Sequence, residues 1–333
     1  MALLIRPGDR GEAVRDLQLR LTAVGLPCES DEPSVFGEAT AAAVRAFQSS
    51  RGLRVDGECG PHTWSALVEA GFALGDRLLY HRTPPLRGDD VAALQRRLGA
   101  LGFDAGRVDG IFGVRTATAL VDFQRNAGLT TDGICGPATL DTLARLGAKA
   151  AAGQSVAQLR EREARRSSPR TLSGRRIVVG HVRGGVSVLV DAVARVLVHA
   201  GAHALPVDDP DQSSQAAQAN AFGADLYLGL TVADDGCAAA YYGTEGFTST
   251  GGRHLATLLC RELPSVLGHA GCDVRAMSLP VLRETRMPAV VCEIGPPARV
   301  VERTAEVARA VTRAIGGWVE APDEVEVEVD PQG

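Results

Sequence analysis

Residues 111–147, "IFGVRTATALVDFQRNAGLTTDGICGPATLDTLARLG", decide the fold of the front of the chain because the same pattern occurs twice. Residues 35–71, "VFGEATAAAVRAFQSSRGLRVDGECGPHTWSALVEAG", agree with them at the Phe-Gly, Phe-Gln, Asp-Gly and Gly-Pro pairs and at one cysteine. With the segments in front, the repeat spans 11–71 and 88–147. An agreement of this length indicates two copies of one supersecondary unit.

Each copy predicts three helices. Apolar residues recur at helical spacing in the first predicted helix of both copies, where they form one face; in the first copy they are Val14, Leu17, Leu21 and Val24. The second predicted helix carries the Phe-Gln pair. Pro61 and Pro137 follow glycines and suit the first turn of the third helix. The front half is therefore expected to be all-α.

These motifs resemble the three-helix peptidoglycan-binding domain, whose pattern includes "FG..T..A...FQ" and "DG..GP.T...L". The resemblance implies a shallow site for cell-wall glycopeptide. The second copy keeps "VDGIFG" where the first has "EPSVFG", so we expect the ligand site in the second copy. Its candidate residues are Asp109, Gly110, Phe112, Gln124 and Asp132. The alternatives are that Gln18, Gln48, Gln95 and Gln124 only hydrogen-bond loops within each copy, or that the domain serves as a protein-interaction module.

Length and composition exclude several classes of function. A chain of 333 residues suggests two or three domains, and 45% hydrophobic with 23% charged residues is typical of a globular protein. A net charge of −5 and 4% aromatic residues argue against nucleic-acid binding. No apolar run reaches the roughly 20 residues of a membrane helix. The seven cysteines include no CxxC pair, so we expect mostly buried thiols in a reducing compartment.

The N-terminal sequence "MALLIRPGDRGEAV" reaches Asp9 and Glu12 too soon for a signal peptide, which predicts a cytoplasmic location. A start codon further upstream would leave room for an export signal. The predicted divisions are a first repeat domain at 1–74, a second at 75–147, a charged linker at 148–174, an α/β domain at 175–319 and an acidic, disordered tail at 320–333. The linker could also be a basic docking segment or a phosphorylation site at Ser167 or Ser168.

From Arg175 onward, predicted strands and helices alternate, which favours a three-layer α/β domain with a mostly parallel sheet. The predicted strands are "RIVVG", "HALPV", "DLYLGLTV", "AAAYY", "LPVLR" and "AVVCEIG". The predicted helices are 186–200, 212–222, 254–267 and 301–315. Together with the front half, this gives a multidomain protein with two small all-α domains and one α/β domain.

The segments "VVGHVRGG", "NAFGADLYLGLTVADD" and "VLRETRMPAVVCEIG" resemble the zinc-dependent N-acetylmuramoyl-L-alanine amidases. The resemblance implies a zinc held by His, Glu and His, with a second Glu as general base. His181 stands at the first ligand position and Glu293 at the base position. No carboxylate lies near the second position at 182–186, and Thr231 occupies the third. His181 is thus the one ligand recognised, and Glu293 is a relic general base.

We therefore expect no bound cofactor, with zinc as the cofactor if a site survives. A rebuilt site from His181, Asp234 or His254 is the alternative. Two binding repeats before a degenerate amidase domain are similar to the CwlM-type branch of actinobacteria, whose members are regulators of cell-wall precursor synthesis. The resemblance implies peptidoglycan or its precursors as ligand and an early precursor enzyme, the UDP-N-acetylglucosamine enolpyruvyl transferase, as partner. The phosphorylatable threonines of that branch are missing from the acidic tail.

Three hypotheses follow for the function. The first is a non-catalytic regulator of peptidoglycan precursor synthesis. The second is an active zinc amidase that hydrolyses the bond between the lactyl group and the stem peptide. The third is a structural tether that binds glycopeptide through the second repeat.

Overall fold

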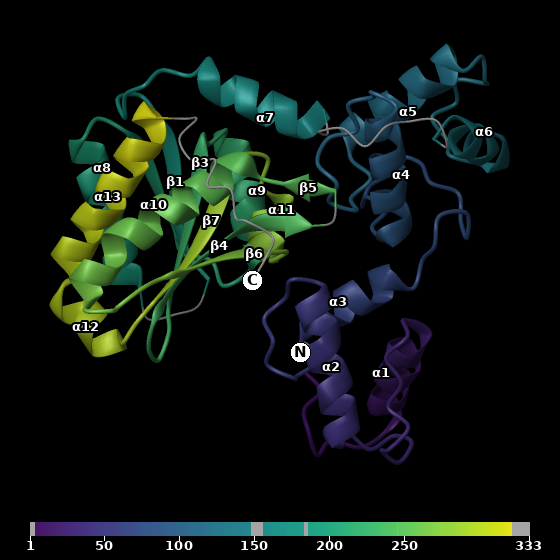
Figure 1. The fold of residues 1–333 in the computed structure, drawn as a ribbon, viewed down its shortest axis with the longest axis horizontal. Coiled ribbons are helices and arrows are strands. Elements are labelled where there is room, and N and C mark those ends of the chain that lie inside the picture. The colour runs from purple at the N-terminus through teal and green to yellow at the C-terminus, as the bar shows by residue number, and fades with distance from the viewer. Residues whose placement is uncertain (1–3, 148–155, 183–185, 245, 322–333) are drawn as a thin grey trace, which may run out of the picture. The chain divides into compact units, whose positions relative to one another are not determined.

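The computed structural model describes residues 4–147, 156–182, 186–244 and 246–321 (Figure 1). The chain forms two compact units. The first consists of the chain up to Leu159 together with Thr244–Phe247, and the second consists of the remainder. The acidic tail beyond residue 321 lies outside the described residues, and so does the first part of the predicted linker. None of the described helices is long and apolar enough to cross a membrane.

The first unit contains two three-helix bundles, as the repeat predicts. The helices are α1 (Glu12–Ala23), α2 (Glu38–Ser50), α3 (Pro61–Ala70), α4 (Asp89–Ala100), α5 (Val114–Asn126) and α6 (Pro137–Gly147). An antiparallel bridge closes each bundle, between Ile5 and Cys59 in the first and between Leu79 and Cys135 in the second. Both cysteines are fully buried, which explains why the repeat shares this residue: a small apolar side chain is needed beneath the bridge.

The repeated Phe-Gly and Phe-Gln pairs supply the centre of each core. Phe36 and Phe47 are 1% exposed in the first bundle, and Phe112 and Phe123 are at most 1% exposed in the second. Each bundle therefore buries its own apolar cluster around the same two aromatic positions. The prediction of two all-α domains is confirmed, and these four phenylalanines form the centres of their cores.

The second unit is a three-layer α/β fold, also as predicted. Its helices are the part of α7 (Val156–Arg166) from Arg160 onward, α8 (Ser187–His199), α9 (Gln212–Phe222), α10 (Thr250–Leu267), α11 (Pro280–Glu284), α12 (Pro297–Glu302) and α13 (Thr304–Glu320). Its strands are β1 (Arg176–His181), β2 (His203–Val207), β3 (Leu226–Val232), β4 (Cys237–Thr244), β5 (Phe247–Thr248), β6 (Asp273–Met277) and β7 (Ala289–Ile294).

The sheet runs in the order β2-β1-β3-β7-β4-β5, and β6 pairs with β4. The first four strands in this order, β2, β1, β3 and β7, are parallel, whereas β4 runs antiparallel to β7. One face packs against α8, α10 and α13 around the largest apolar core, and α9 and α11 cover the other face (Figure 1). The carboxyl ends of β1, β3 and β7 consequently meet at one edge.

The structure differs from the predicted elements at three places. The segment "LPVLR", predicted as a strand, forms helix α11, because Pro280 stands in the first helical turn and five residues are too few to establish a period. Strand β6 was not predicted, because it is a short edge strand whose residues are mostly exposed, so its five residues, DVRAM, give only a weak pattern. Helix α10 begins at Thr250, before the predicted start at 254, since Ser249 caps it by accepting a hydrogen bond from the amide of Gly252.

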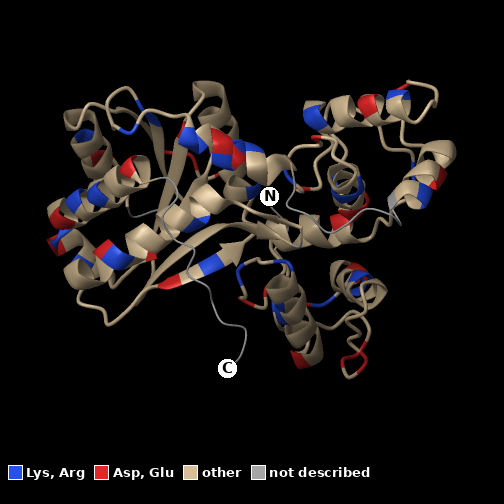
Figure 2. Ribbon diagram, turned by 45° about the horizontal axis from the view of Figure 1, so that its top comes forward, with Lys and Arg blue, Asp and Glu red and all other residues tan. Residues whose placement is uncertain are grey.

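Helix α7, within the predicted linker, has specific contacts in the second unit. The Glu161 carboxylate accepts hydrogen bonds from the Ser249 hydroxyl at 2.8 Å and the Gly251 amide at 2.7 Å, at the N-terminus of α10. Arg165 donates to His254 Nδ1 at 2.7 Å and stacks on Trp318. Figure 2 shows basic and acidic residues interspersed along α7. The second half of this charged helix is therefore bound to the α/β fold rather than fully solvated.

Candidate functional site

The carboxyl edge of the parallel strands is the expected place for a site in an open α/β sheet. Strand β1 ends at His181, and Thr231 and Glu293 lie next to the last residues of β3 and β7. The structure therefore brings the sequence candidates to one edge.

The strand register separates the two candidates at this edge. His181 is paired with Leu230, which is paired with Cys292, whereas Glu293 is paired with Thr231. Paired residues of neighbouring strands share a face, and successive residues alternate. His181 thus belongs to the face that packs against α8, α10 and α13, and Glu293 belongs to the opposite face.

His181 is 7% exposed and makes a short contact with a neighbouring carboxylate. Its Nε2 lies 2.5 Å from Oδ1 of Asp208, the residue that follows β2. Its Nδ1 is buried and has no hydrogen-bond partner within the described part of the chain. A carboxylate on one ring nitrogen fixes the orientation of the imidazole. Asp208 could not be identified from the sequence, because only the pairing of β2 with β1 places it beside His181.

A buried polar network lies behind His181. Gln215 on α9 donates to the carbonyl oxygens of His181 at 2.5 Å and Asp209 at 2.6 Å, and it accepts a hydrogen bond from the Tyr227 hydroxyl at 2.6 Å. Burial raises the pKa of Tyr227 well above its ordinary value. A Cβ at Gly180 would collide with both Gln215 and Tyr227. The sequence signal for this network was a tyrosine in an otherwise apolar strand.

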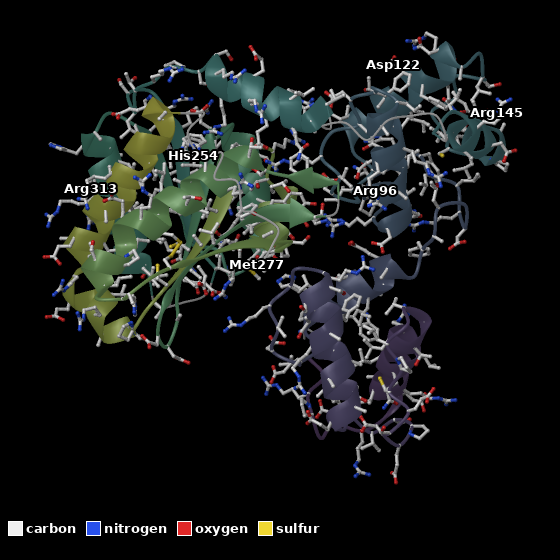
Figure 3. All side chains as sticks on the ribbon, in the orientation of Figure 1. Arg96, Asp122, Arg145, His254, Met277 and Arg313 are labelled. Atoms are coloured by element: carbon white, nitrogen blue, oxygen red, sulfur yellow. A yellow bond between two sulfur atoms is a disulfide. The ribbon has the colours of Figure 1, made fainter. Side chains whose placement is uncertain are left out.

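The alternative ligands His254 and Asp234 do not join His181. His254 lies in the first turns of α10 (Figure 3). A Cβ on nearby Gly252 would lie 3.1 Å from the carbonyl oxygen of Ala289, the first residue of β7. Glu293 is four residues further along this strand, or about 13 Å. His254 is therefore at the opposite edge of the sheet, and Asp234 is exposed in the loop after β3.

His269, which the sequence did not single out, is at the correct edge. Its Nε2 lies 2.6 Å from the carbonyl oxygen of Gly295, directly after β7, and its Nδ1 is 3.9 Å from the exposed Asp235 carboxylate. The link to Gly295 depends on where α10 ends, which the sequence pattern does not reveal.

These donors do not fit a catalytic zinc ion, which needs three protein ligands and one open position. In the four described ranges, no three side chains of His, Cys, Asp or Glu are grouped so that they could hold a metal ion. Position 231 supplies only a buried threonine hydroxyl. Among the residues that the structure describes, the imidazole of His181 therefore has Asp208 as its partner and lacks the two further ligands of a zinc site.

The five candidates of the second repeat have internal contacts. The side-chain amide of Gln95 donates to Asp109 Oδ1 at 2.8 Å and accepts from the amides of Asp109 and Gly110. Gln124 repeats the pattern with Asp132 at 2.8 Å and with the amide of Gly133 at 2.9 Å. Each glutamine thus holds a turn against its helix.

Burial supports this structural role. Phe112 is 0% and Gln124 is 1% exposed, so neither side chain can reach a ligand at the surface without rearrangement. Hydrogen bonds from the Ile134 amide and the Gln124 side chain lower the pKa of Asp132. Asp109, Gly110 and Asp132 contact these glutamines. Such contacts are expected if the glutamines only hydrogen-bond loops within each repeat.

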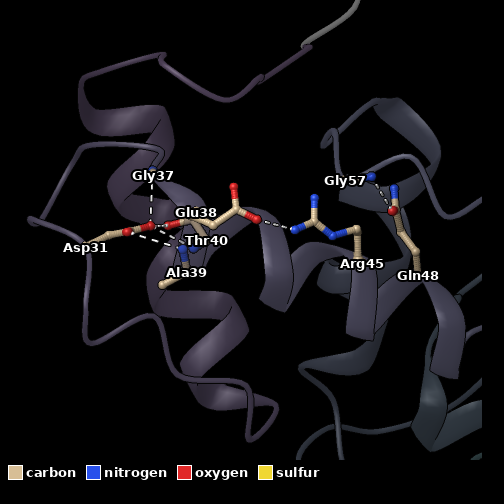
Figure 4. Close-up of polar contacts among 8 residues, drawn as sticks. All are labelled: Asp31, Gly37, Glu38, Ala39, Thr40, Arg45, Gln48 and Gly57. Atoms are coloured by element: carbon tan, nitrogen blue, oxygen red, sulfur yellow. Dashed lines mark hydrogen bonds and ion pairs between the residues drawn. The ribbon is translucent and has the colours of Figure 1, made fainter.

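The first repeat makes equivalent contacts without the Asp-Gly pair. Gln18 accepts from the amide of Ser34 at 3.0 Å, as Gln95 does from Gly110. Gln48 accepts from the amide of Gly57 at 2.9 Å (Figure 4). The loss of Asp-Gly in "EPSVFG" is therefore compensated by local bonding, and it does not by itself distinguish a binding repeat from a non-binding one.

Comparison with known proteins agrees with both units. The model of a putative peptidoglycan binding domain matches residues 10–67 and 87–143. The N-acetylmuramoyl-L-alanine amidase CwlM of Mycobacterium tuberculosis is 40% identical over 331 residues, which cover 87% of this chain and 81% of that protein. The chain belongs to the CwlM family.

Other relatives match one part of this CwlM-family chain. A probable N-acetylmuramoyl-L-alanine amidase of Bacillus licheniformis is 36% identical over 41% of this chain and 43% of its own length. Among solved structures, an N-acetylmuramoyl-L-alanine amidase from Clostridium difficile 630 is 14% identical, with a TM-score of 0.38 over 45% of this chain and 98% of its own. The predicted combination of two peptidoglycan-binding domains with an amidase-like domain is confirmed for this member of the CwlM family.

Proposed function

We propose that this chain is a non-catalytic regulator of peptidoglycan precursor synthesis, and that it recognises peptidoglycan or its precursors through its repeats. Two observations support the proposal: the described residues contain no group of three metal ligands, and His181 and Glu293 belong to opposite faces of the sheet. The repeats support the ligand class, because both match a peptidoglycan-binding domain.

Hydrolysis of an amide by this type of fold needs a metal-activated water and a base on the same side of the substrate. Glu293 alone could accept a proton from a water molecule, but without a metal that water keeps its ordinary, very high pKa. The amidase-like unit is therefore proposed to act as a binding surface.

The proposed partner is an early enzyme of the precursor pathway, the UDP-N-acetylglucosamine enolpyruvyl transferase, as the similarity to CwlM-type proteins suggests. This role requires the chain to act in the cytoplasm, where that enzyme uses its nucleotide-linked substrate. The partner is testable directly with purified components.

A working zinc amidase is the second candidate, because the mycobacterial relative carries an amidase name. It requires one zinc per chain, with His181 as a ligand, and release of stem peptide from muropeptides. The two candidates therefore differ in metal content and in activity.

The deciding experiment measures zinc content and muropeptide cleavage for the wild type, His181→Ala and Glu293→Gln, with the exposed Glu302→Gln as the matched control. We expect less than stoichiometric zinc and no cleavage in all four proteins. Stoichiometric zinc that is lost in His181→Ala, with cleavage lost in Glu293→Gln but kept in Glu302→Gln, would establish the amidase. Stimulation of the purified transferase by the wild-type chain supports the regulator, and failure to bind or stimulate it contradicts that partner.

A further inference from the structure

Four of the seven cysteines converge in the second unit, although 55 residues separate the first from the last in sequence. They come from four segments: the start of β4, the middle of α10, the loop before β6, and β7. They are Cys237, Cys260, Cys272 and Cys292. Cys260 and Cys272 form a disulfide, and the Cys237 sulfur lies 2.8 Å from the Cys272 sulfur. The other five cysteines are buried thiols, as expected, and this disulfide is the exception.

Strand register explains the convergence. Strand β4 pairs in parallel with β6 so that Ala238 is opposite Asp273, which brings Cys237 next to Cys272. On its other side, β4 pairs with β7 so that Cys237 is opposite Ile294 and Ala239 is opposite Cys292. Cys237 and Cys292 are thus diagonal neighbours on one face of the sheet, and diagonal neighbours of this kind are within side-chain reach.

We propose that Cys237 is the attacking thiol of an intramolecular thiol–disulfide exchange with the Cys260–Cys272 disulfide. Cys237 loses its proton, and a lone pair of its sulfur forms a new bond to the Cys272 sulfur. The bond between Cys272 and Cys260 breaks, and its electron pair leaves with Cys260, which takes up a proton. One disulfide and one thiol are present before and after, so the step needs no external oxidant or reductant.

The surroundings of Cys237 favour this role. A hydrogen bond from the Cys292 thiol lowers the pKa of Cys237, and it outweighs the opposing effects of burial and of the Asp273 carboxylate. The same hydrogen bond, together with burial, raises the pKa of Cys292, which therefore remains the proton donor. The attacking species in thiol–disulfide exchange is the thiolate, and a neighbouring donor increases its population. Cys260 is partly exposed and can be released toward solvent.

The exchange acts on the edge that carries Glu293. The disulfide between Cys260 and Cys272 closes a loop that contains His269, and His269 contacts the carbonyl oxygen of Gly295 at 2.6 Å. The amide of Gly295 in turn donates to the carbonyl oxygen of Gly236, directly before Cys237, at 2.9 Å. Transfer of the disulfide to Cys237–Cys272 opens the His269 loop and ties β4 to the start of β6. The exchange thus changes which segments are held beside the carboxyl edge.

Disulfide mapping of the full-length, oxidised chain tests the proposal. The protein is incubated with iodoacetamide, quenched with acid, digested and analysed by mass spectrometry. We expect carbamidomethyl label to accumulate on Cys260 together with a Cys237–Cys272 cross-link. In Cys237→Ser the label on Cys260 should be lost, because the disulfide then stays between Cys260 and Cys272. The matched control Cys28→Ser, a buried cysteine of the first repeat, should label Cys260 like the wild type.

A second variant keeps the test independent of how Cys237→Ser folds. In oxidised Cys260→Ser, Cys272 has lost its first partner, and we expect a Cys237–Cys272 disulfide. The proposal is overturned if Cys272 remains a free thiol in this variant, or if the wild type retains only the Cys260–Cys272 linkage with Cys260 unlabelled. It is also overturned if the isolated chain holds stoichiometric metal that is released by any one of the four cysteine substitutions, since the cluster would then be a thiolate metal site.

Discussion

The His181 imidazole and the Glu293 carboxylate reach the same edge of the sheet but belong to opposite faces of it. The pairing of His181 with Leu230 and of Glu293 with Thr231 fixes this relationship through β3, the strand between them. The register places the Cβ atoms of the two residues on opposite faces of the sheet. This separation onto two faces therefore follows from backbone register.

Zinc should not stabilise the chain through His181. A ligand present at 100 times its dissociation constant stabilises a fold by about 2.7 kcal/mol, which a melting curve detects. We expect no difference in the zinc-induced shift of Tm between the wild type and His181→Ala. The comparison isolates His181, because any zinc bound by cysteine thiols affects both proteins equally. A shift present in the wild type and absent in the variant would contradict the proposal that the chain has no zinc site at His181.

The hydrogen-bond geometry that the glutamines share in the two repeats predicts an effect on stability. Gln95→Ala leaves the amide of Gly110 and the Thr116 hydroxyl without this partner in a buried place. An unsatisfied buried group costs about 1–3 kcal/mol. We expect faster hydrogen exchange in residues 105–116, measured by mass spectrometry. The exposed Gln218→Ala should change exchange by less than about 0.5 kcal/mol. Unchanged protection in Gln95→Ala would contradict this structural role of the glutamine.

The elements predicted correctly are those with a long, strongly periodic sequence pattern. The spacing of Phe36 and Phe47, repeated in the second copy, identifies the helical bundles because those residues fill the core. The alternation of apolar strands with amphipathic helices predicts the layers of the second unit. Segment "LPVLR" was predicted wrongly, because a short apolar run supports helix and strand equally.

The site could not be predicted to the same depth, because its geometry depends on non-local pairing. Whether His181 and Glu293 share a face depends on the register of three strands. The contact of His181 with Asp208 requires β2 beside β1. The four cysteines are brought together by the pairing of β4 with β6 and β7. Their spacing in the sequence does not predict this convergence.

Ser34 and Gly110 occupy equivalent turns, and both have a φ of 68°. A side chain in the left-handed region costs about 1–2 kcal/mol, which glycine avoids. Gly110→Ser should therefore destabilise the second bundle by about 1 kcal/mol, and Ser34→Gly should leave the first bundle equal or more stable. Hydrogen exchange resolves the two bundles. If Ser34→Gly instead destabilises the first bundle, the Ser34 side chain contributes more to stability than its backbone strain costs.

Asp31 should make the first bundle sensitive to acid. Burial works to raise the pKa of Asp31, but hydrogen bonds from the Thr40 hydroxyl and from the amides of Thr40, Ala39 and Gly37 outweigh it and lower the pKa (Figure 4). The stabilisation is complete above the unfolded pKa of about 3.9 and is lost as pH falls through the lower, folded value.

The variant Asp31→Ala tests this at two pH values. Because Asp31 is partly exposed, we expect a loss of less than about 1 kcal/mol at pH near 7, and no difference from the wild type in strong acid. The control is Glu38→Gln, which breaks the exposed ion pair with Arg45 at 2.6 Å and should have little effect. Protection of the α2 amides against hydrogen exchange provides the measurement. A difference that persists in strong acid would assign the effect to packing.

The Cys292 thiol should control the protonation of Cys237. The thiolate fraction of Cys237 rises with pH, and its pKa lies below the ordinary 9.0, so exchange should proceed at lower pH than an ordinary thiol allows. Cys292→Ala removes the donor and should move the titration to higher pH. The Cys237 thiolate is measured by its ultraviolet absorbance. The absorbance of the same protein carrying Cys237→Ser is subtracted, so that only the contribution of Cys237 remains. Cys28→Ala should leave the midpoint unchanged, whereas an unchanged midpoint in Cys292→Ala would show that Cys292 does not stabilise the attacking thiolate.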